Sequence, residues 1–280
     1  MNEIQAILVG FIQGLSEFLP ISSSAHIVFT SSLYKLITGI SLPAAAPSEE
    51  VFFDIVVHLA TLFAVLIFFR EEIKEILVGF FSGLKNKKYD DNNFKIGLYI
   101  IITTGITGVI GLLIKDFAHS LVSNPKIVSL LLVLTGFILL FSEKFKKENK
   151  EINLKSAIII AIAQGLAVFP GLSRSGLTIS SAIFQGIDRV KAAKFSFLMS
   201  IPVIILASLV YPLLEIDIAE VQTFNFKAII LGFITAFVSG YICIKYFMNF
   251  LGKSSLKSFA YYCFGCGLVM FLIFSLCRHL

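Results

Sequence analysis

Gln13-Gly-Leu-Ser-Glu-Phe-Leu-Pro-Ile-Ser-Ser-Ser-Ala-His26 is the stretch that decides the architecture of this chain. A second copy of the pattern, Gln164-Gly-Leu-Ala-Val-Phe-Pro-Gly-Leu-Ser-Arg-Ser-Gly-Leu-Thr178, follows at a shift of 151 residues. The aligned pairs are Gln13 with Gln164, Gly14 with Gly165, Phe18 with Phe169, Ser22 with Ser173, and Ser24 with Ser175. The repetition predicts two related halves, residues 1–150 and 151–280.

Proline and serine interrupt each copy in the middle. Residues 1–18 and 22–37 read as two short apolar helices around the first break, and residues 156–186 hold the corresponding second pair. Neither copy has the roughly 20 unbroken apolar residues that a membrane-spanning helix requires. One interpretation is that Pro20 and Pro170 only kink ordinary spans, as proline does in many membrane helices. The apolar length on both sides of each break favours two half-spans joined by a turn.

The composition places the chain in a membrane. Of its 280 residues, 57% are hydrophobic and only 15% are charged, whereas a soluble protein carries about 25% charged residues. The net charge of +5 comes from lysines in the connections between apolar segments. This distribution fits the orientation of loops across a membrane and argues against a nucleic-acid-binding protein.

Six further segments are long and apolar enough to cross a bilayer. They are residues 51–69, 96–114, 127–141, 195–214, 227–249 and 259–277. Each half then holds one broken pair followed by three spans, and an odd number of crossings inverts the second half relative to the first. We therefore predict an all-α integral membrane protein with six transmembrane helices and two re-entrant broken-helix pairs in an inverted-topology repeat. Such architectures place binding sites near the middle of the bilayer.

The basic residues indicate the orientation in the membrane. Sixteen of the 23 Lys and Arg residues fall in the connections 70–95, 143–155, 188–194 and 250–258, which the predicted topology puts on one side. The opposite side receives the lysine-free segment 39–50 and the acidic residues Glu215, Asp217 and Glu220. Because basic connections stay in the cytoplasm, we expect both termini outside.

Glu17 and Arg174 are the charged residues of the two copies. An ionised group inside a membrane segment costs roughly 2.5–3.5 kcal/mol on insertion scales, so such residues usually face a wet cavity and have a function. The two could also pair with each other merely to hold the halves together. The planar fork of arginine suits phosphate oxygens, and serines beside a break are typical of helix N-termini, which favour anions. We therefore expect a phosphate site where the two breaks meet.

Other polar residues of the first break extend this set. Gln13 and Glu17 lie four residues apart on one helix face, and so do Ser22 and His26. A carboxylate, hydroxyl groups, a histidine and an arginine at a helix end are typical of phosphoryl transfer or phosphate-ester hydrolysis. The alternative is a transporter or flippase of a phosphorylated polyprenyl lipid, because inverted repeats are also a transporter architecture. A flippase needs an anion site but no nucleophile or base, which favours hydrolysis.

These motifs resemble those of the undecaprenyl-diphosphate phosphatases, also called bacitracin-resistance proteins. The family motif Glu/Gln-x-x-x-Glu stands at residues 13–17, and Phe-Leu-Pro-x-Ser-Ser-x-x-His stands at residues 18–26. Pro-Gly-x-Ser-Arg-Ser-Gly-x-Thr is complete at residues 170–178, and Phe-Asp-x-x-x-His-Leu stands at residues 53–59. The resemblance covers essentially the whole chain. Its mild departures are Ser24, Ala25 and Ala60, where many members have Thr, Gly and Gly.

The resemblance implies a multi-pass hydrolase of the bacterial cytoplasmic membrane. It would remove the terminal phosphate of undecaprenyl diphosphate, a lipid carrier of peptidoglycan assembly, in a cavity that opens to the outer face and with a divalent cation, Mg2+ or Ca2+. The positions implied as catalytic are Glu17, Ser23, His26 and Arg174. Ser23 or water could be the nucleophile, with Glu17 or His26 as the base. We expect phosphate oxygens at Gln13, Ser22, Ser24, Ser173, Ser175 and Thr178, and the cation at Glu17 and Gln13.

Two further pairs of polar residues lie within the predicted spans. Asp54 and His58 are four residues apart on one helix face and could either support the site from outside or form a packed polar pair. Cys263 and Cys266 form a lone Cys-x-x-Cys motif. Because no second motif accompanies it, we predict small core residues there and no metal or redox site.

A pattern of small residues marks one close helix contact. Gly232, Ala236 and Gly240 recur every four residues. Small residues at this spacing let membrane helices approach one another closely. The contact could lie within the bundle or between the protomers of a homodimer, and the sequence does not distinguish the two.

Overall fold

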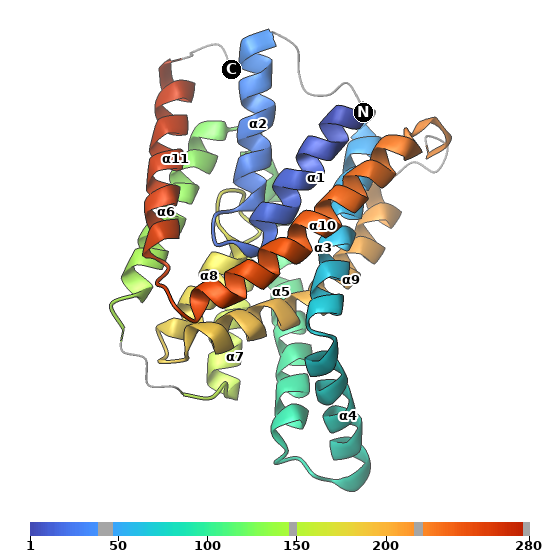
Figure 1. The fold of residues 1–280 in the computed structure, drawn as a ribbon, viewed down its shortest axis with the longest axis vertical. Coiled ribbons are helices and arrows are strands. Elements are labelled where there is room, and N and C mark those ends of the chain that lie inside the picture. The colour runs from blue at the N-terminus through green and yellow to red at the C-terminus, as the bar shows by residue number, and fades with distance from the viewer. Residues whose placement is uncertain (39–46, 146–149, 216–220, 277–280) are drawn as a thin grey trace.

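The computed structural model is all-helical (Figure 1). It describes residues 1–38, 47–145, 150–215 and 221–276, and these residues form eleven α-helices and one short 3-10 helix, Val221–Thr223. The α-helices are α1 (Glu3–Phe18), α2 (Ser23–Thr38), α3 (Pro47–Phe68), α4 (Arg70–Asn86), α5 (Asn92–Val122), α6 (Pro125–Ser142), α7 (Leu154–Leu166), α8 (Arg174–Ile183), α9 (Arg189–Glu215), α10 (Phe226–Leu251) and α11 (Lys257–Leu276).

Six of these helices are long and apolar enough to cross a membrane. They are α3, α5, α6, α9, α10 and α11, and they coincide with the six predicted spans. Many of their large apolar side chains point outward; Leu113 of α5, for example, is 79% exposed. Such a continuous apolar exterior is unfavourable in water and suits a lipid environment. The prediction of a multi-pass, all-helical membrane protein is confirmed.

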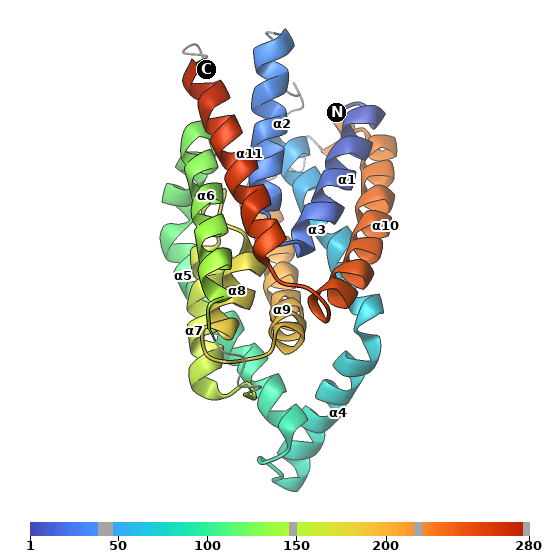
Figure 2. The same cartoon turned by 60° about the vertical axis from the view of Figure 1, so that its left-hand side comes forward.

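The two interrupted stretches form two pairs of short helices at different heights. In Figures 1 and 2, α1 and α2 lie in the upper half of the molecule, and α7 and α8 lie in the lower half. Helix α1 ends at Phe18 because Leu19 is extended (φ −69°, ψ 144°), the conformation that a following proline favours. The second turn contains Gly171 at φ 101°, a conformation that side-chain-bearing residues rarely adopt.

Helix α4 occupies a segment that the sequence predicted only as a polar connection, residues 70–95. Its charged residues concealed an apolar face, on which Ile73 and Ile76 pack against the core. Phe80 stacks on Phe94 of α5 with 5.5 Å between ring centroids, and the next turn brings Gly83 against the same ring. The segment is therefore a helical hairpin with α5, drawn at the lower end of Figure 1.

The helix ends also differ from the prediction. Helix α5 covers 31 residues, because its polar ends continue the helix beyond the apolar segment 96–114. Helix α9 begins at Arg189, inside the basic connection that was expected to precede the span. The predicted outer segment 39–50 lies mostly outside the described residues, as do Asp217, Glu220 and part of 143–155.

The small-residue pattern of α10 packs within the chain, against α1. A Cβ atom added to Gly10 would lie 2.4 Å from the Gly232 carbonyl oxygen, and one added to Gly14 would lie 2.0 Å from the Ser239 Oγ atom. These two helices therefore touch backbone to backbone. At the end of α1 the Phe18 ring packs edge-on against Phe197 of α9, with 5.4 Å between centroids. This aromatic contact anchors the last residue of α1, next to the start of the first turn.

We predict that Gly14→Ala separates α1 from α10. The added methyl group would meet the Ser239 hydroxyl and backbone atoms of α10 at 2.0–2.8 Å, and overpacking of this kind typically costs about 1–3 kcal/mol. The measurement is the midpoint of thermal unfolding in detergent. Gly105→Ala is the matched control, because nothing lies within 4 Å of a Cβ atom there. An unchanged midpoint for Gly14→Ala would contradict the backbone contact.

Candidate active site

The two turns bring the N-termini of two helices to one place. Ser23 is the first residue of α2, and Arg174 is the first residue of α8. The hydroxyl oxygen of Ser22 accepts a hydrogen bond from the Ala25 amide at 3.3 Å, and that of Ser173 accepts one from the Gly176 amide at 3.1 Å. Both serines thus cap their helices. The first turn of each helix, where free backbone N–H groups favour anions, faces the meeting point.

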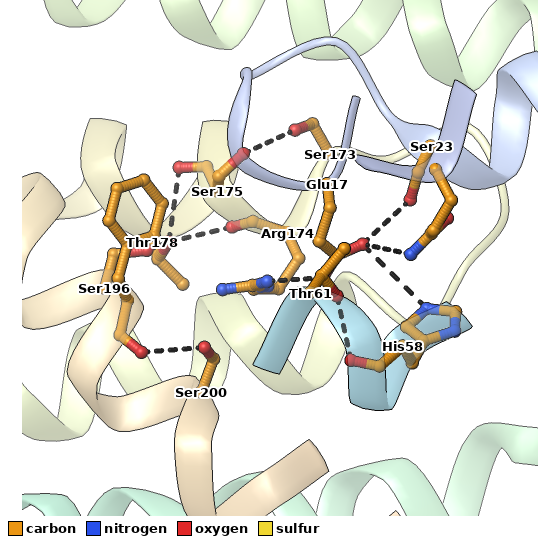
Figure 3. A network of polar contacts seen from close by, with 12 residues as sticks. Glu17, Ser23, His58, Thr61, Ser173, Arg174, Ser175, Thr178, Ser196 and Ser200 are labelled. Carbon is orange, nitrogen blue, oxygen red and sulfur yellow. Dashed lines mark hydrogen bonds and ion pairs between the residues drawn. The ribbon is translucent and has the colours of Figure 1, made fainter. Parts of the chain in front are cut away.

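Glu17 of α1 lies at the centre of the site (Figure 3). Its Oε1 atom accepts a hydrogen bond from Arg174 Nη2 at 2.6 Å. Its Oε2 atom accepts hydrogen bonds from Gln13 Nε2 at 2.9 Å and from Ser23 Oγ at 3.1 Å. The Glu17 side chain is only 8% exposed and that of Arg174 is 18% exposed, so the ion pair is largely shielded from solvent. Three residues named in the sequence analysis, Gln13, Ser23 and Arg174, therefore donate to the carboxylate of a fourth, Glu17.

A cavity of about 230 Å³ opens beside this carboxylate. It is lined by Ser16, Glu17, Ser22, Ser23, Ser24, His58, Ala167, Val168, Leu172, Ser173 and Arg174. The lining comes from the end of α1, from both turns and from α3, and its wall combines hydroxyl groups, one carboxylate and one guanidinium group. A cavity of this size accommodates a small anion but not the whole of a long-chain lipid, whose chain would have to lie outside it.

Two buried atoms at Glu17 have no hydrogen-bond partner among the residues that the structure describes. One is the acceptor Gln13 Oε1 and the other is the donor Arg174 Nη1. Buried polar groups are almost always hydrogen-bonded, and an unpaired one costs free energy. Arg174 lines the cavity and Gln13 does not, and Gln164 Oε1 and Ser180 Oγ, which also lie outside the cavity lining, are unpaired in the same way. The Arg174 nitrogen suits an anionic oxygen, and the Gln13 amide oxygen suits a cation or a protonated group.

The remaining serines join the two turns to each other. Ser22 and Ser24 share a hydrogen bond at 3.1 Å, as Ser173 and Ser175 do at 3.2 Å. Across the turns, the Ser24 hydroxyl accepts a hydrogen bond from the Gly171 amide at 3.4 Å, and the Ser175 hydroxyl donates one to the Leu19 carbonyl at 3.0 Å. The serine pairs therefore hold the two turns together; Ser22, Ser24 and Ser173 also line the cavity, whereas Ser175 does not.

Thr178 and Gln164 lie behind the site. The Thr178 hydroxyl contacts Ser196 Oγ at 2.6 Å and donates to the Arg174 carbonyl at 2.8 Å. Gln164, which aligns with Gln13, donates to Thr107 Oγ1 at 3.2 Å instead of to a carboxylate. The halves are therefore not chemically equivalent, because Glu17 has no acidic counterpart in the second copy, where Val168 aligns with it.

His26 does not line the cavity. Its ring Nδ1 atom lies 2.7 Å from the Ser22 carbonyl oxygen, and its Nε2 atom lies 2.7 Å from the Tyr262 hydroxyl of α11. The spacing of Ser22 and His26 on one helix face predicts this first contact. The second contact joins residues 236 positions apart, so periodicity along one helix does not reveal it.

His58 does line the cavity. Its Nε2 atom lies 3.9 Å from Glu17 Oε2, and its Nδ1 atom lies 2.8 Å from the Asp54 carbonyl oxygen. From the sequence, Asp54 and His58 could either support the site or form a packed polar pair. In the structure His58 lines the cavity, and the Asp54 carboxylate lies 3.6 Å from its Nδ1 atom. The sequence signal that points to His58 as a site residue is its place inside an otherwise apolar span, where polar residues usually serve a function.

Comparison with known proteins gives a consistent result. The family model described as "Bacitracin resistance protein BacA" matches residues 6–269. The chain belongs to this family. "Undecaprenyl-diphosphatase 2" of Halalkalibacterium halodurans is 38% identical over 279 residues, which cover 98% of this chain and 97% of the relative. "Undecaprenyl-diphosphatase" of Halothermothrix orenii is 40% identical, with 98% of each chain covered, and that of Methanobrevibacter smithii is 37% identical, with 97% and 98% covered.

The arrangement in this BacA-family chain has three chemical capacities. Ser23 is a hydroxyl hydrogen-bonded to a carboxylate, which can accept its proton. Arg174 supplies a guanidinium fork with one free nitrogen for phosphate oxygens. Two helix N-termini add partial positive charge at the same point. Together these groups can activate a nucleophile next to a bound phosphate.

Proposed function

We propose that this protein hydrolyses undecaprenyl diphosphate to undecaprenyl phosphate and inorganic phosphate, and so recycles the lipid carrier and confers bacitracin resistance. The observation that carries the proposal is the contact of the Glu17 carboxylate with both Ser23 and Arg174 at the meeting of two helix N-termini. Relatives named undecaprenyl-diphosphatase match over the full length, and the six apolar helices suit a membrane-embedded substrate.

Ser23 is the nucleophile in the mechanism that we favour. Its Oγ atom attacks the terminal phosphorus while Glu17 takes its proton, the phosphorus–oxygen bond to the bridging oxygen breaks, and undecaprenyl phosphate leaves. Glu17 passes this proton to the departing undecaprenyl phosphate and is again a carboxylate. It then takes a proton from the water that attacks the phosphoserine and returns it to the Ser23 oxygen as the bond to phosphorus breaks, so that inorganic phosphate leaves. Arg174 and the helix N-termini stabilise the negative charge on the transferring group. Direct attack by water with Glu17 as base is the alternative route.

A divalent cation fits the donors present. Among the described residues no group of three His, Cys, Asp or Glu side chains could enclose a metal ion. Mg2+ at phosphate sites is commonly held by one or two carboxylates together with substrate oxygens. Here the oxygen ligands would be the Glu17 carboxylate and the unpaired amide oxygen of Gln13 beside it. Gln13 and Glu17 would hold the ion, which would supply charge neutralisation at the diphosphate.

We further propose an inverted-topology repeat in the membrane. Helices α1 and α2 would re-enter from the outer side and α7 and α8 from the cytoplasmic side, consistent with their separate heights in Figures 1 and 2. The protein would lie in the bacterial cytoplasmic membrane with its cavity open to the outer face, where the lipid diphosphate is released.

Phosphate release from purified protein tests the function. In detergent there is no gradient and no second compartment, so a flippase would release nothing, whereas the proposed hydrolase should release phosphate from undecaprenyl diphosphate. Addition of EDTA should stop the reaction and excess Mg2+ or Ca2+ should restore it. A protein that binds the lipid without releasing phosphate would refute the hydrolase.

Glu17→Gln should lower kcat by at least about 100-fold, the usual loss when a general base is removed. The amide keeps the shape but retains a single acceptor oxygen, so it can accept the hydrogen bond of Arg174 or that of Ser23 but not both. Thermal unfolding in detergent checks that the variant is folded. Near-normal turnover in the folded variant would exclude Glu17 as base or metal ligand.

Arg174→Lys should remain at least about tenfold impaired. Lysine keeps the positive charge but loses the planar fork, which presents one nitrogen to Glu17 and leaves the other for the substrate. The loss should appear in kcat/KM for undecaprenyl diphosphate. Full activity of the lysine variant would mean that a point charge suffices.

Single cysteines in a cysteine-free background test the orientation. Asn86 and Ser123 are both exposed; Asn86 ends α4, shortly before the start of α5, and Ser123 follows the other end of α5. In intact cells a membrane-impermeant thiol reagent should label Ser123→Cys and leave Asn86→Cys unlabelled until the membrane is opened. The reverse pattern would invert the topology. Ser24→Cys, in the cavity lining, should react from outside and be protected by a substrate analogue.

A further inference from the structure

The turn that presents Ser23 has an unusual backbone. Ser22 has φ 67°, in the left-handed region that non-glycine residues adopt only occasionally. The same residue caps α2, and the next residue carries the hydroxyl that contacts Glu17. The position of the Ser23 Oγ atom therefore depends on the conformation of Ser22.

The Ser22 carbonyl is held from two sides by one residue. The backbone amide of His26 donates to it at 3.4 Å, and the His26 ring Nδ1 atom lies 2.7 Å away. A carbonyl oxygen only accepts hydrogen bonds, so Nδ1 carries a hydrogen atom. In the neutral ring Nε2 is then an acceptor, and the Tyr262 hydroxyl at 2.7 Å donates to it.

Helix α11 supports this arrangement through two neighbouring residues. The Tyr262 ring stacks on the His26 ring with 5.7 Å between centroids and an angle of 9° between the planes. The adjacent Cys263 Sγ atom donates to the Pro20 carbonyl at 3.6 Å, on the other side of the turn. Helix α11 therefore contacts the first turn on both sides of Ser22, at the Pro20 carbonyl and at the His26 ring. Neither Tyr262 nor His26 lines the cavity.

From these contacts we infer that Tyr262 is a positioning residue for the reaction. Through His26 it holds the Ser22 carbonyl, and with it the turn that presents the Ser23 hydroxyl to Glu17. His26 acts in the same way, by positioning the turn, and exchanges no proton with the substrate. The inference rests on the proposed hydrolase function and adds to it two supporting residues on different helices.

Tyr262→Phe is the first test. It keeps the ring that stacks on His26 and removes only the hydroxyl, so kcat should fall roughly two- to tenfold, the range of one lost hydrogen bond. KM should stay nearly unchanged, because Tyr262 does not touch the cavity. Tyr261→Phe is the matched control with wild-type rates, since this neighbouring tyrosine is 61% exposed. Unchanged kcat in Tyr262→Phe would overturn the inference.

Two substitutions of His26 separate positioning from proton transfer. The amide nitrogen of asparagine can take the place of Nδ1 and donate to the carbonyl four residues earlier, whereas the longer glutamine reaches the place of Nε2. His26→Asn should stay within about tenfold of the wild-type rate, and His26→Gln should be clearly slower. If His26 transferred protons, both variants would fall alike by at least about 100-fold, and that result would refute the positioning role.

A double-mutant cycle tests whether Tyr262 acts through His26. Asparagine at position 26 offers no acceptor to the Tyr262 hydroxyl, so adding Tyr262→Phe to His26→Asn should cause no further loss. The same fold loss in both backgrounds would show that Tyr262 acts independently, and the inference would fail.

A thiol probe keeps the inference testable without substrate. In a cysteine-free background, with serine at position 263 to keep a donor to Pro20, the labelling rate of Ser23→Cys reports the geometry of the turn. Tyr262→Phe should change this rate and Tyr261→Phe should not. If the wild-type protein released no phosphate, the proposed function would fail, and this comparison would still decide the inference. Equal labelling rates in the two variants would overturn it.

Discussion

The ion pair between Glu17 and Arg174 is the interaction on which the rest of the structure depends. A charged side chain within a membrane protein is costly when unpaired, and removing one partner of a buried pair typically costs about 3–5 kcal/mol. The two charges can pair only if the end of α1 and the start of α8 lie at the same depth in the membrane protein. The breaks after Phe18 and before Arg174 produce this condition, because each places a short helix end, and not a helix middle, at the centre of the molecule.

The packing around the pair explains why the two turns are so well defined. Serine hydroxyls bridge the turns, α10 holds α1 through a contact between small residues, and α11 holds the turn after α1. Each of these supports comes from a segment distant in sequence. An active site built on helix ends has little local rigidity, and tertiary contacts supply it here. Among the described residues, the Gln13 Oε1 and Arg174 Nη1 atoms have no hydrogen-bond partner, so this support does not extend to every polar atom around Glu17.

The residues that meet at the Glu17 carboxylate were easier to single out from the sequence than the contacts that each of them makes. Glu17 and Arg174 could be found because charges are rare in apolar segments, whereas Ser23 was singled out from its neighbouring serines only by the resemblance to the family motif. Helix α4 was missed because its charges obscured the spacing of Ile73, Ile76 and Phe80, which becomes meaningful only when α5 is present to bury them. The directions of the two histidine rings were also hidden: His58 lines the cavity and His26 does not. A ring direction depends on what another helix offers, and Tyr262 offers His26 a hydroxyl and a flat face.

The contact between α1 and α10 has a consequence for how the chain is made. Helix α1 leaves the ribosome before the other described helices, yet the helix that receives it begins more than 200 residues later, at Phe226. Until α10 has been synthesised, Gly10 and Gly14 have no partner, and the two halves cannot mature one after the other as separate units. Contacts between such distant segments slow folding. The packing of α1 therefore remains incomplete until α10 has been synthesised. Assembly of the site that α1 carries is then among the last steps of biogenesis.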